Sequence, residues 1–476
     1  MSFRHKGLVA AMEDDQDTGG GPVEMVPETT AQVEADSAEL TEDSNELEDV
    51  VVAAEEAEAD AAALGDIAGV MEESVQEGEG LDETAAQITE VAVESICARL
   101  GVRRYSRTIP SMESFGSRSS RVSATRIAME GIGDIIKKIW DAIVSAAKRV
   151  WEFIRGIAGK ITKSRDSLLK HLEDLEEKVV KLSSGAKMKE KKISGGFAKV
   201  FTFEKKSNLD TATKILVCSG GAIPSAKKMV AEYSKLSQIF IGRVDEISKD
   251  ANGADSVKST PALIATFDTL KSVVIGYASG LGSSTAEAVA KLKEKNKLKG
   301  EVGVHGAFPN GKSFFYEISN RGERAKTEKA AALTDAEKSE NLTIKLGFME
   351  NSKEEADEAD ALDKAGMQKL LEAAITTVKQ LKEYDKIKSD IESTVKTVIT
   401  AADKVLKAAS SVAREGEDKG KARRLNELAS ISREVVSALS QTGAQLPTMA
   451  YNAAKSAGDY VSASIRNLES GDKKKD

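Results

Sequence analysis

The feature that most constrains this chain is the long run from Lys364 to Ala413, in which apolar residues recur at spacings of three and four. That spacing places them on one face of an α-helix and is typical of helices that pack lengthwise against others. Unbroken, the helix would be about 75 Å long at 1.5 Å per residue. One irregularity falls near Tyr384. The pattern therefore predicts a fold built around long packed helices. The apolar positions are Met367, Leu371, Ala374, Val378, Leu381, Ile387, Ile391, Val395, Val398, Ala402, Val405 and Ala409.

A second amphipathic helix is predicted over residues 131–162, beginning at Gly131. Its apolar face is wide and carries both tryptophans of the chain, Trp140 and Trp151. Basic residues dominate the other face, so that the segment has a net charge of +3. Such a helix is suited either to the core of a bundle or to a membrane interface. The basic residues of this helix include Lys137, Lys138, Lys148 and Arg149.

Between these helices the sequence predicts a mixed region with one small, mostly antiparallel sheet. The residues Asn310-Gly311 favour a hairpin turn within 301–318. We therefore assign the chain to the mainly α class (α+β), a helical body with a small antiparallel sheet. Further strands are predicted at 200–204, 214–218 and 342–349, and further helices at 167–182, 224–248, 260–296, 425–441 and 448–468.

A literal match to the phosphate-binding loop of nucleotide-binding proteins runs from Gly306 to Ser313 and includes Lys312. That chemistry needs a strand, a loop of amides and then a helix whose first turn faces the phosphates. Here a strand-like run of aromatic residues follows Ser313. The match is therefore interpreted as part of a β-hairpin, and nucleotide binding through Lys312 stays as an alternative function.

The charge of the chain is divided unevenly along its length. Residues 1–98 hold 27 acidic residues against Arg4 and Lys6, a net charge of −25, whereas the whole chain carries −9. The remainder therefore carries +16. Self-repulsion and few large apolar groups favour disorder in the acidic part, with short helices around 50–64 and 84–100. Residues 99–130 are rich in arginine and serine and are predicted to form a flexible linker.

Few residues are available for metal or redox chemistry. The chain has two cysteines, Cys97 and Cys218, which cannot form a disulfide framework. It has three well-separated histidines. We predict no metal site and no cofactor. No stretch is long and apolar enough to read as a membrane-spanning helix.

The boundary between linker and body carries a short motif. Ala128-Met129-Glu130 stands directly before Gly131, and Ser111-Met112-Glu113 is a second candidate. Both are similar to the sites that head maturation proteases of phiKZ-like giant phages cut, which have Ser, Ala or Gly, any residue and then Glu. The same pattern occurs at 37–39, 44–46 and 432–434. With an acidic tail before a basic body, the layout of the chain resembles the internal head proteins of these phages, including those of the inner body.

This resemblance implies a non-enzymatic virion protein, made in the host cytoplasm and packed inside the head after a cut behind Glu130. The mature body, 131–476, would carry +11. Its implied partners are the prohead protease, other internal head proteins and packaged DNA, held by non-specific electrostatics. A membrane-active or ejected protein acting through 131–162 is the rival from another class. The expected parts are an acidic disordered propeptide (1–98), a linker with the cleavage site (99–130), an amphipathic helical segment (131–190), a mixed α+β domain (191–350) and a long-helix bundle (351–476).

Overall fold

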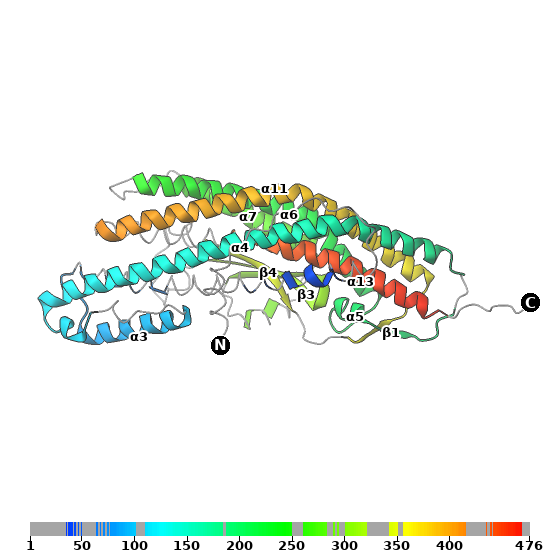
Figure 1. Ribbon diagram of the computed structural model, residues 1–476, viewed down its shortest axis with the longest axis horizontal. Helices are drawn as coiled ribbons and strands as arrows, with labels where there is room; N and C mark the ends of the chain where they lie inside the picture. Colours follow the sequence, from blue (N-terminus) through cyan, green and yellow to red (C-terminus); the bar gives the residue numbers. More distant parts are fainter. Residues whose placement is uncertain are drawn as a thin grey trace, which may run out of the picture.

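Long helices lying side by side form an elongated bundle, with a small sheet along one face (Figure 1). The long helices are α4 (Arg118–Val180), α6 (Leu209–Lys249), α11 (Lys364–Glu415) and α13 (Leu446–Arg466). Within this computed structural model, single residues and short stretches are described between 35 and 75, at 289–294 and at 435–439. The continuously described ranges are 77–100, 110–183, 187–249, 260–282, 300–320, 342–350, 356–415 and 441–468.

Helix α11 confirms the long helix predicted from the 364–413 pattern, and it packs against α4, α6 and α13. Its buried face contains the predicted apolar positions from Met367 to Val398. The approach to α6 is close at Gly220, where an added Cβ would lie 3.1 Å from the Cα of Thr377. The Thr377 hydroxyl donates a hydrogen bond to the Leu216 carbonyl across the same crossing, at 3.1 Å. A small residue at this crossing therefore sets how near the two helices lie.

Helix α4 is longer than predicted. It begins at Arg118 rather than at Gly131, and it continues through the helix expected separately at 167–182. Ser117 caps its first turn, since the Ser117 side chain accepts a hydrogen bond from the Ser120 amide. Upstream of Gly131 the apolar stripe continues, with buried residues at the same helical spacing, which explains why the arginine-rich stretch joins the helix. These residues are Ala124 and Ala128, and the same spacing leads on to Ile132.

Two predicted strands are wrong. In the predicted strand 200–204, Val200 is the last residue of the short helix α5 (Gly196–Val200), and Phe203 forms only a single bridge, to Lys206. Residues 214–218 lie inside α6. The helix predicted at 224–248 begins earlier than expected, because α6 starts at Leu209 and includes Pro224. β-branched residues favour strands locally, but Ile215 and Leu216 are buried in the bundle. Tertiary packing decides the outcome here.

The hairpin prediction is confirmed. Strands β2 (Glu301–Phe308) and β3 (Lys312–Asn320) pair in antiparallel register, and β4 (Leu342–Glu350) joins the other edge of β3. Asn310 and Gly311 both have positive φ, 59° and 67°, as a tight hairpin turn requires. A second, two-stranded antiparallel sheet joins β1 (Lys192–Ser194) to β5 (Glu358–Asp360).

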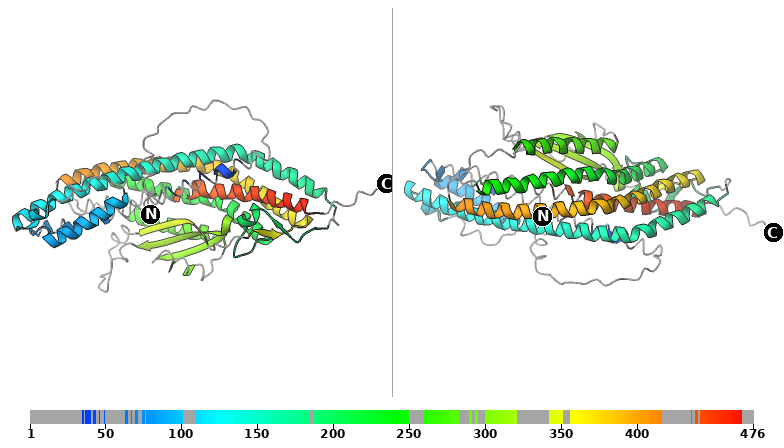
Figure 2. Two further views of the ribbon diagram at one scale, coloured as in Figure 1. Left: turned by 60° about the horizontal axis from the view of Figure 1, so that its bottom comes forward. Right: turned by 90° about the horizontal axis from the view of Figure 1, so that it is seen from above.

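Helix α7 (Thr260–Gly280) covers part of the three-stranded sheet, as two further views show (Figure 2). It ends earlier than the predicted 260–296 helix, and Gly282 beyond it has φ +112°. Helix α13 confirms the last predicted helix. The helices expected around 50–64 and 425–441 fall almost entirely outside the described residues.

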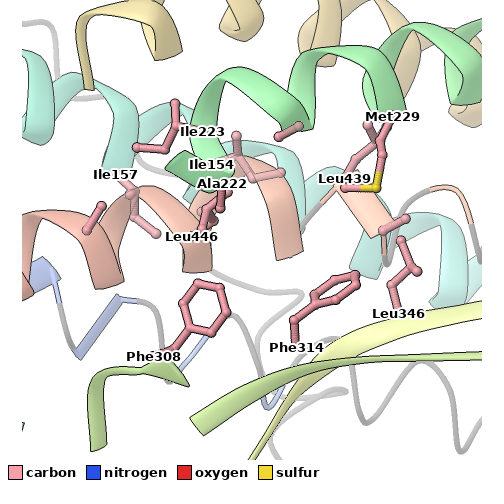
Figure 3. Close-up of a cluster of buried hydrophobic side chains, with 14 of the residues drawn as sticks. Ile154, Ile157, Ala222, Ile223, Met229, Phe308, Phe314, Leu346, Leu439 and Leu446 are labelled. Atoms are coloured by element: carbon pink, nitrogen blue, oxygen red, sulfur yellow. The ribbon is translucent and has the colours of Figure 1, made fainter. Parts of the chain in front are cut away.

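The core joins the sheet to the bundle. Phe308 and Phe314 of the hairpin point towards apolar side chains of the helices above them (Figure 3). Phe314 also meets Tyr277 of α7 edge-on, with ring centroids 4.9 Å apart. Burying one large apolar side chain stabilises a fold by about 1.5–3 kcal/mol. Among the residues above the hairpin are Ile154, Ile157, Ala222, Ile223, Met229, Leu439 and Leu446.

Polar contacts fix the relative positions of the helices. The Arg165 guanidinium of α4 donates to the Asp385 carboxylate of α11 at 2.7 Å. At the far end of α4, the Lys364 ammonium donates to the Val180 and Leu182 carbonyls, where a cation complements a helix C-terminus. The Tyr384 hydroxyl donates to the carbonyl of Gly443, within the turn η4 (Gln441–Gln445).

Candidate maturation boundary and basic face

The first candidate cleavage sequence lies inside helix α4. Ala128 is completely buried, Met129 and Gly131 are half-buried, and Glu130 is exposed. A protease acts most readily on exposed, irregular chain, so a cut after Glu130 requires this part of the helix to unwind locally. Gly131 and Gly133 lower that cost, because a glycine inside a helix is less favourable than alanine by about 0.5–1 kcal/mol.

The second candidate lies in a more accessible place. Ser111 and Glu113 are exposed, and Met112 is half-buried. Met112 and Glu113 belong to the 3₁₀ turn η1 (Met112–Phe115), which precedes the capped start of α4. A cut after Glu113 would leave α4 whole, whereas a cut after Glu130 would remove its first residues.

Part of the acidic segment is fixed against the start of α4. The Leu81 amide donates to the Thr125 hydroxyl at 2.9 Å, and the Arg118 side chain donates to the Gly78 carbonyl at 3.2 Å. Gly80, with φ +64°, comes so near that an added Cβ would lie 2.6 Å from the Arg121 carbonyl carbon. Helix α3 (Glu83–Leu100) follows directly and lies at the same end of the molecule (Figure 1). Its span confirms the helix expected around 84–100.

A second part of the acidic segment contacts the middle of the bundle. The Lys160 ammonium of α4 donates to Glu39 Oε1 at 2.6 Å and to Asp43 Oδ2 at 2.7 Å. Partial burial of Lys160 lowers its pKa, but the hydrogen bonds and charges of Asp43 and Glu39 outweigh that effect, so the pKa is raised above its usual 10.5. Leu40, between the two acids, is completely buried. The Ser37 hydroxyl donates to the Asn452 side-chain carbonyl of α13 at 2.9 Å.

These fixed contacts were not predicted from the sequence. Lys160 and Glu39 are 121 positions apart, and nothing in the composition of either segment singles out that pair. The one available signal was charge: a strongly acidic segment and a basic body attract each other. Charge alone does not say which lysine is paired or that Leu40 is buried beside it.

The predicted amphipathic face of α4 points into the bundle over its described part. Val150, Ile154 and Ile157 are buried, and Trp151 is half-buried against the same core. Lys148 is exposed and Arg149 half-buried, as expected for the opposite face. The side chains of Lys137, Lys138 and Trp140 lie outside the described residues. In the part of the chain that the structure describes, no helix is both long and apolar enough to span a membrane.

The hairpin residues that match a phosphate-binding loop have a different geometry. Lys312 begins strand β3, and Ser313 is buried with its hydroxyl donating to the Gly306 carbonyl at 2.8 Å. No helix follows the loop to direct amides at a phosphate, because β3 continues through Asn320.

The cysteine and histidine side chains of the bundle and sheet have different surroundings. Cys218 is buried, and burial raises the pKa of its thiol. His171 is half-buried on α4, and His305 contacts the Gly282 carbonyl at 2.8 Å. Across the described residues, no group of three or more His, Cys, Asp or Glu side chains is arranged to hold a metal ion.

Comparison with known proteins identifies the chain at the level of its family. The family model of phiKZ-like phage internal head proteins matches residues 32–463, so the chain belongs to that family. This membership places the protein in the interior of the phage head. No curated protein and no solved structure matches the chain.

Proposed function

We propose that this protein is a non-enzymatic structural component of the phage head, made with an acidic propeptide that the prohead protease removes after Glu130. The mature body, 131–476, then packs with DNA or with other internal proteins. The observation that carries the proposal is the coincidence of the family match with the charge step, since −25 lies before residue 99 and +11 after residue 130.

The electrostatic consequence of removal is large. While the propeptide is attached, its acidic residues offset the basic body, and the whole chain carries −9. After the cut, the body alone is positive and is attracted to the phosphates of packaged DNA without any need to read bases. A single proteolytic step thus reverses the sign of the net charge.

The contacts of the acidic segment support its role as a propeptide that is held during assembly. It is fixed at two places, around Leu81 at the start of α4 and around Leu40 at Lys160. The family match begins at residue 32, so it includes most of this segment together with the body. Both observations fit a propeptide that folds with the body before it is cut away.

The N-terminus of the protein in purified virions tests the proposal. Mass spectrometry of the mature protein should find a first residue at Gly131. A start at Ser114 would move the cut to the exposed turn after Glu113 and keep the rest of the proposal. An intact start at Met1 or Ser2 would contradict proteolytic maturation, and the acidic segment would then be a permanent part of the head protein.

A further inference from the structure

Four residues of the acidic segment, Ser37, Glu39, Leu40 and Asp43, contact the bundle together. Glu39 and Asp43 place one carboxylate oxygen each on the Lys160 ammonium, at 2.6 and 2.7 Å. Leu40 anchors the segment by complete burial, and Ser37 adds a hydrogen bond to Asn452 of α13. We call these four residues the acidic clamp. It joins α4 to α13 and covers the side chain of Lys160, which is 31% exposed.

Lys160 lies beside a row of exposed basic residues on α4. Lys148, Arg155, Lys163 and Lys170 follow one another at intervals of seven or eight residues, close to two helical turns each. They therefore share one face, with successive charges separated by about 11 Å along the axis. We call these four residues the basic row.

Acidic residues near the basic row reduce its charge without cancelling it. Glu152, Asp166 and Glu173 are exposed on the same face of α4. Glu392 of α11 interacts electrostatically with Arg155. Four cations against the three acids of this face still leave the α4 face positive, and Lys160 would add a further charge beside it.

Resting on the proposed function, we infer that the acidic clamp masks Lys160, and that release of the propeptide adds this lysine to the basic row as a binding surface for DNA phosphates. Two carboxylate oxygens occupy the ammonium as two phosphate oxygens would. Either candidate cut, after Glu113 or after Glu130, separates the clamp from the body. Proteolysis would therefore control the DNA-binding surface at a specific place as well as through net charge.

The test uses the full chain and compares two double variants that each remove two negative charges. Glu39→Gln/Asp43→Asn removes the clamp carboxylates, and Glu46→Gln/Asp49→Asn removes the same charge from two exposed positions of the same segment. Fluorescence anisotropy at low salt measures the affinity for a mixed-sequence duplex of about 30 base pairs. We expect the clamp variant to bind about fivefold more tightly than wild type, and the control variant less than about twofold more tightly.

Lys160→Gln completes a double-mutant cycle. In the wild-type chain it should change DNA affinity by less than about 1.5-fold, because the clamp already covers the lysine, whereas in the clamp variant it should abolish most of the gain. Circular dichroism of each variant shows that the bundle remains folded.

The outcomes distinguish the masking of Lys160 from the binding of DNA by the protein. Equal gains in the clamp and control variants, or a gain that survives Lys160→Gln, would overturn the masking of Lys160 and leave the DNA contact standing. If no variant binds the duplex even at low salt, the DNA contact of the proposed function fails and the masking of a DNA-binding lysine fails with it. The family assignment depends on neither result.

Discussion

Residues 118–130 and residues 150–180 belong to one helix, α4, yet different contacts hold the two stretches. In the first, the buried side chains are the small Ala124, Thr125 and Ala128, and polar contacts from residues 78–82 and the turn η1 meet it. The second contributes a continuous apolar seam to the bundle, from Val150 to Val179. A helix can therefore be continuous in geometry while its two ends differ in how easily they open, since local stability follows buried apolar contact.

The largest expected difference between the two stretches concerns stability. Leu172 is completely buried, with its Cδ2 3.2 Å from the Cβ position of Gly458 on α13. Leu172→Ala should lower the free energy of unfolding by about 2–5 kcal/mol, because it leaves a cavity in the core. Ile127→Ala, at a position 52% exposed in the first stretch, should change it by about 0.5 kcal/mol or less. Urea unfolding followed by circular dichroism measures both, and similar losses would contradict the comparison.

The second prediction concerns the docking of residues 78–82. Gly80→Ala would place a Cβ against the backbone of α4, whereas Gly78→Ala, also at positive φ, meets nothing within 4 Å. Both variants carry the same backbone strain, so their difference isolates the contact. Cleavage at Glu113 and Glu130 by a glutamyl endoprotease should be about tenfold faster in Gly80→Ala than in Gly78→Ala. Losing about 1.4 kcal/mol of the free energy that docks residues 78–82 on α4 would raise the population of the open, cleavable form by that factor. Equal rates would show that this contact does not hold the start of α4.

The third prediction concerns the glycines beside the first candidate cut. Gly133→Ala should strengthen the helix by about 0.5–1 kcal/mol and slow cleavage after Glu130 by about two- to fivefold. Gly156→Ala makes the same change in the bundle half of α4, where an added Cβ meets nothing within 4 Å. It should leave the rate at Glu130 unchanged. The same digestion measures both, and a matched slowing by Gly156→Ala would mean that the whole helix opens as one unit.

The smallest expected effect is a pH dependence of stability that arises from residues 150–180 of α4. Burial lowers the pKa of His171 below its usual 6.5, opposed in part by Asp459 and Asp174 and assisted by Lys178 and Lys455. The unfolded chain then binds the proton more readily, so stability falls as the pH drops through about 6.5 towards the folded pKa. His171→Gln should reduce the loss of stability between about pH 7.5 and pH 5, measured by urea midpoints. An unchanged pH profile would exclude His171 as a source of that loss.

Patterns that extend over many residues, or that need one specific turn, were predicted well. The spacing in α11 and the Asn310-Gly311 turn each determine one structure from local sequence, and both are confirmed. Residues 214–218 were assigned wrongly because their β-branched composition favours a strand, while their neighbours in α6 bury Ala212 and Ile215 at helical spacing. The start of α4 was missed because serine and arginine were taken as linker residues although the buried positions Ala124 and Ala128 continue the stripe.

The family and the candidate boundary could be inferred from a charge step and a short motif, but the clamp could not. Its contacts join Ser37 to Asn452, 415 positions apart, and Glu39 to Lys160, 121 positions apart. Such pairs depend on how α4 and α13 lie side by side, and that arrangement follows from the packing of the whole bundle. The opposite charges of the two segments predict that they attract, whereas the atoms that meet are determined by the fold.

The continuity of α4 across Glu130 gives a cut there a further effect. A severed helix acquires a new first turn, with four amide groups that have lost their carbonyl partners and with the positive end of the helix dipole. A new α-amino group at Gly131 would add to that positive end. Asp134, four positions into the new chain, is of the residue type that stabilises such a terminus. Proteolysis at this place would therefore create a chemically new end of the protein, polar and cationic, where the precursor has an uninterrupted helix.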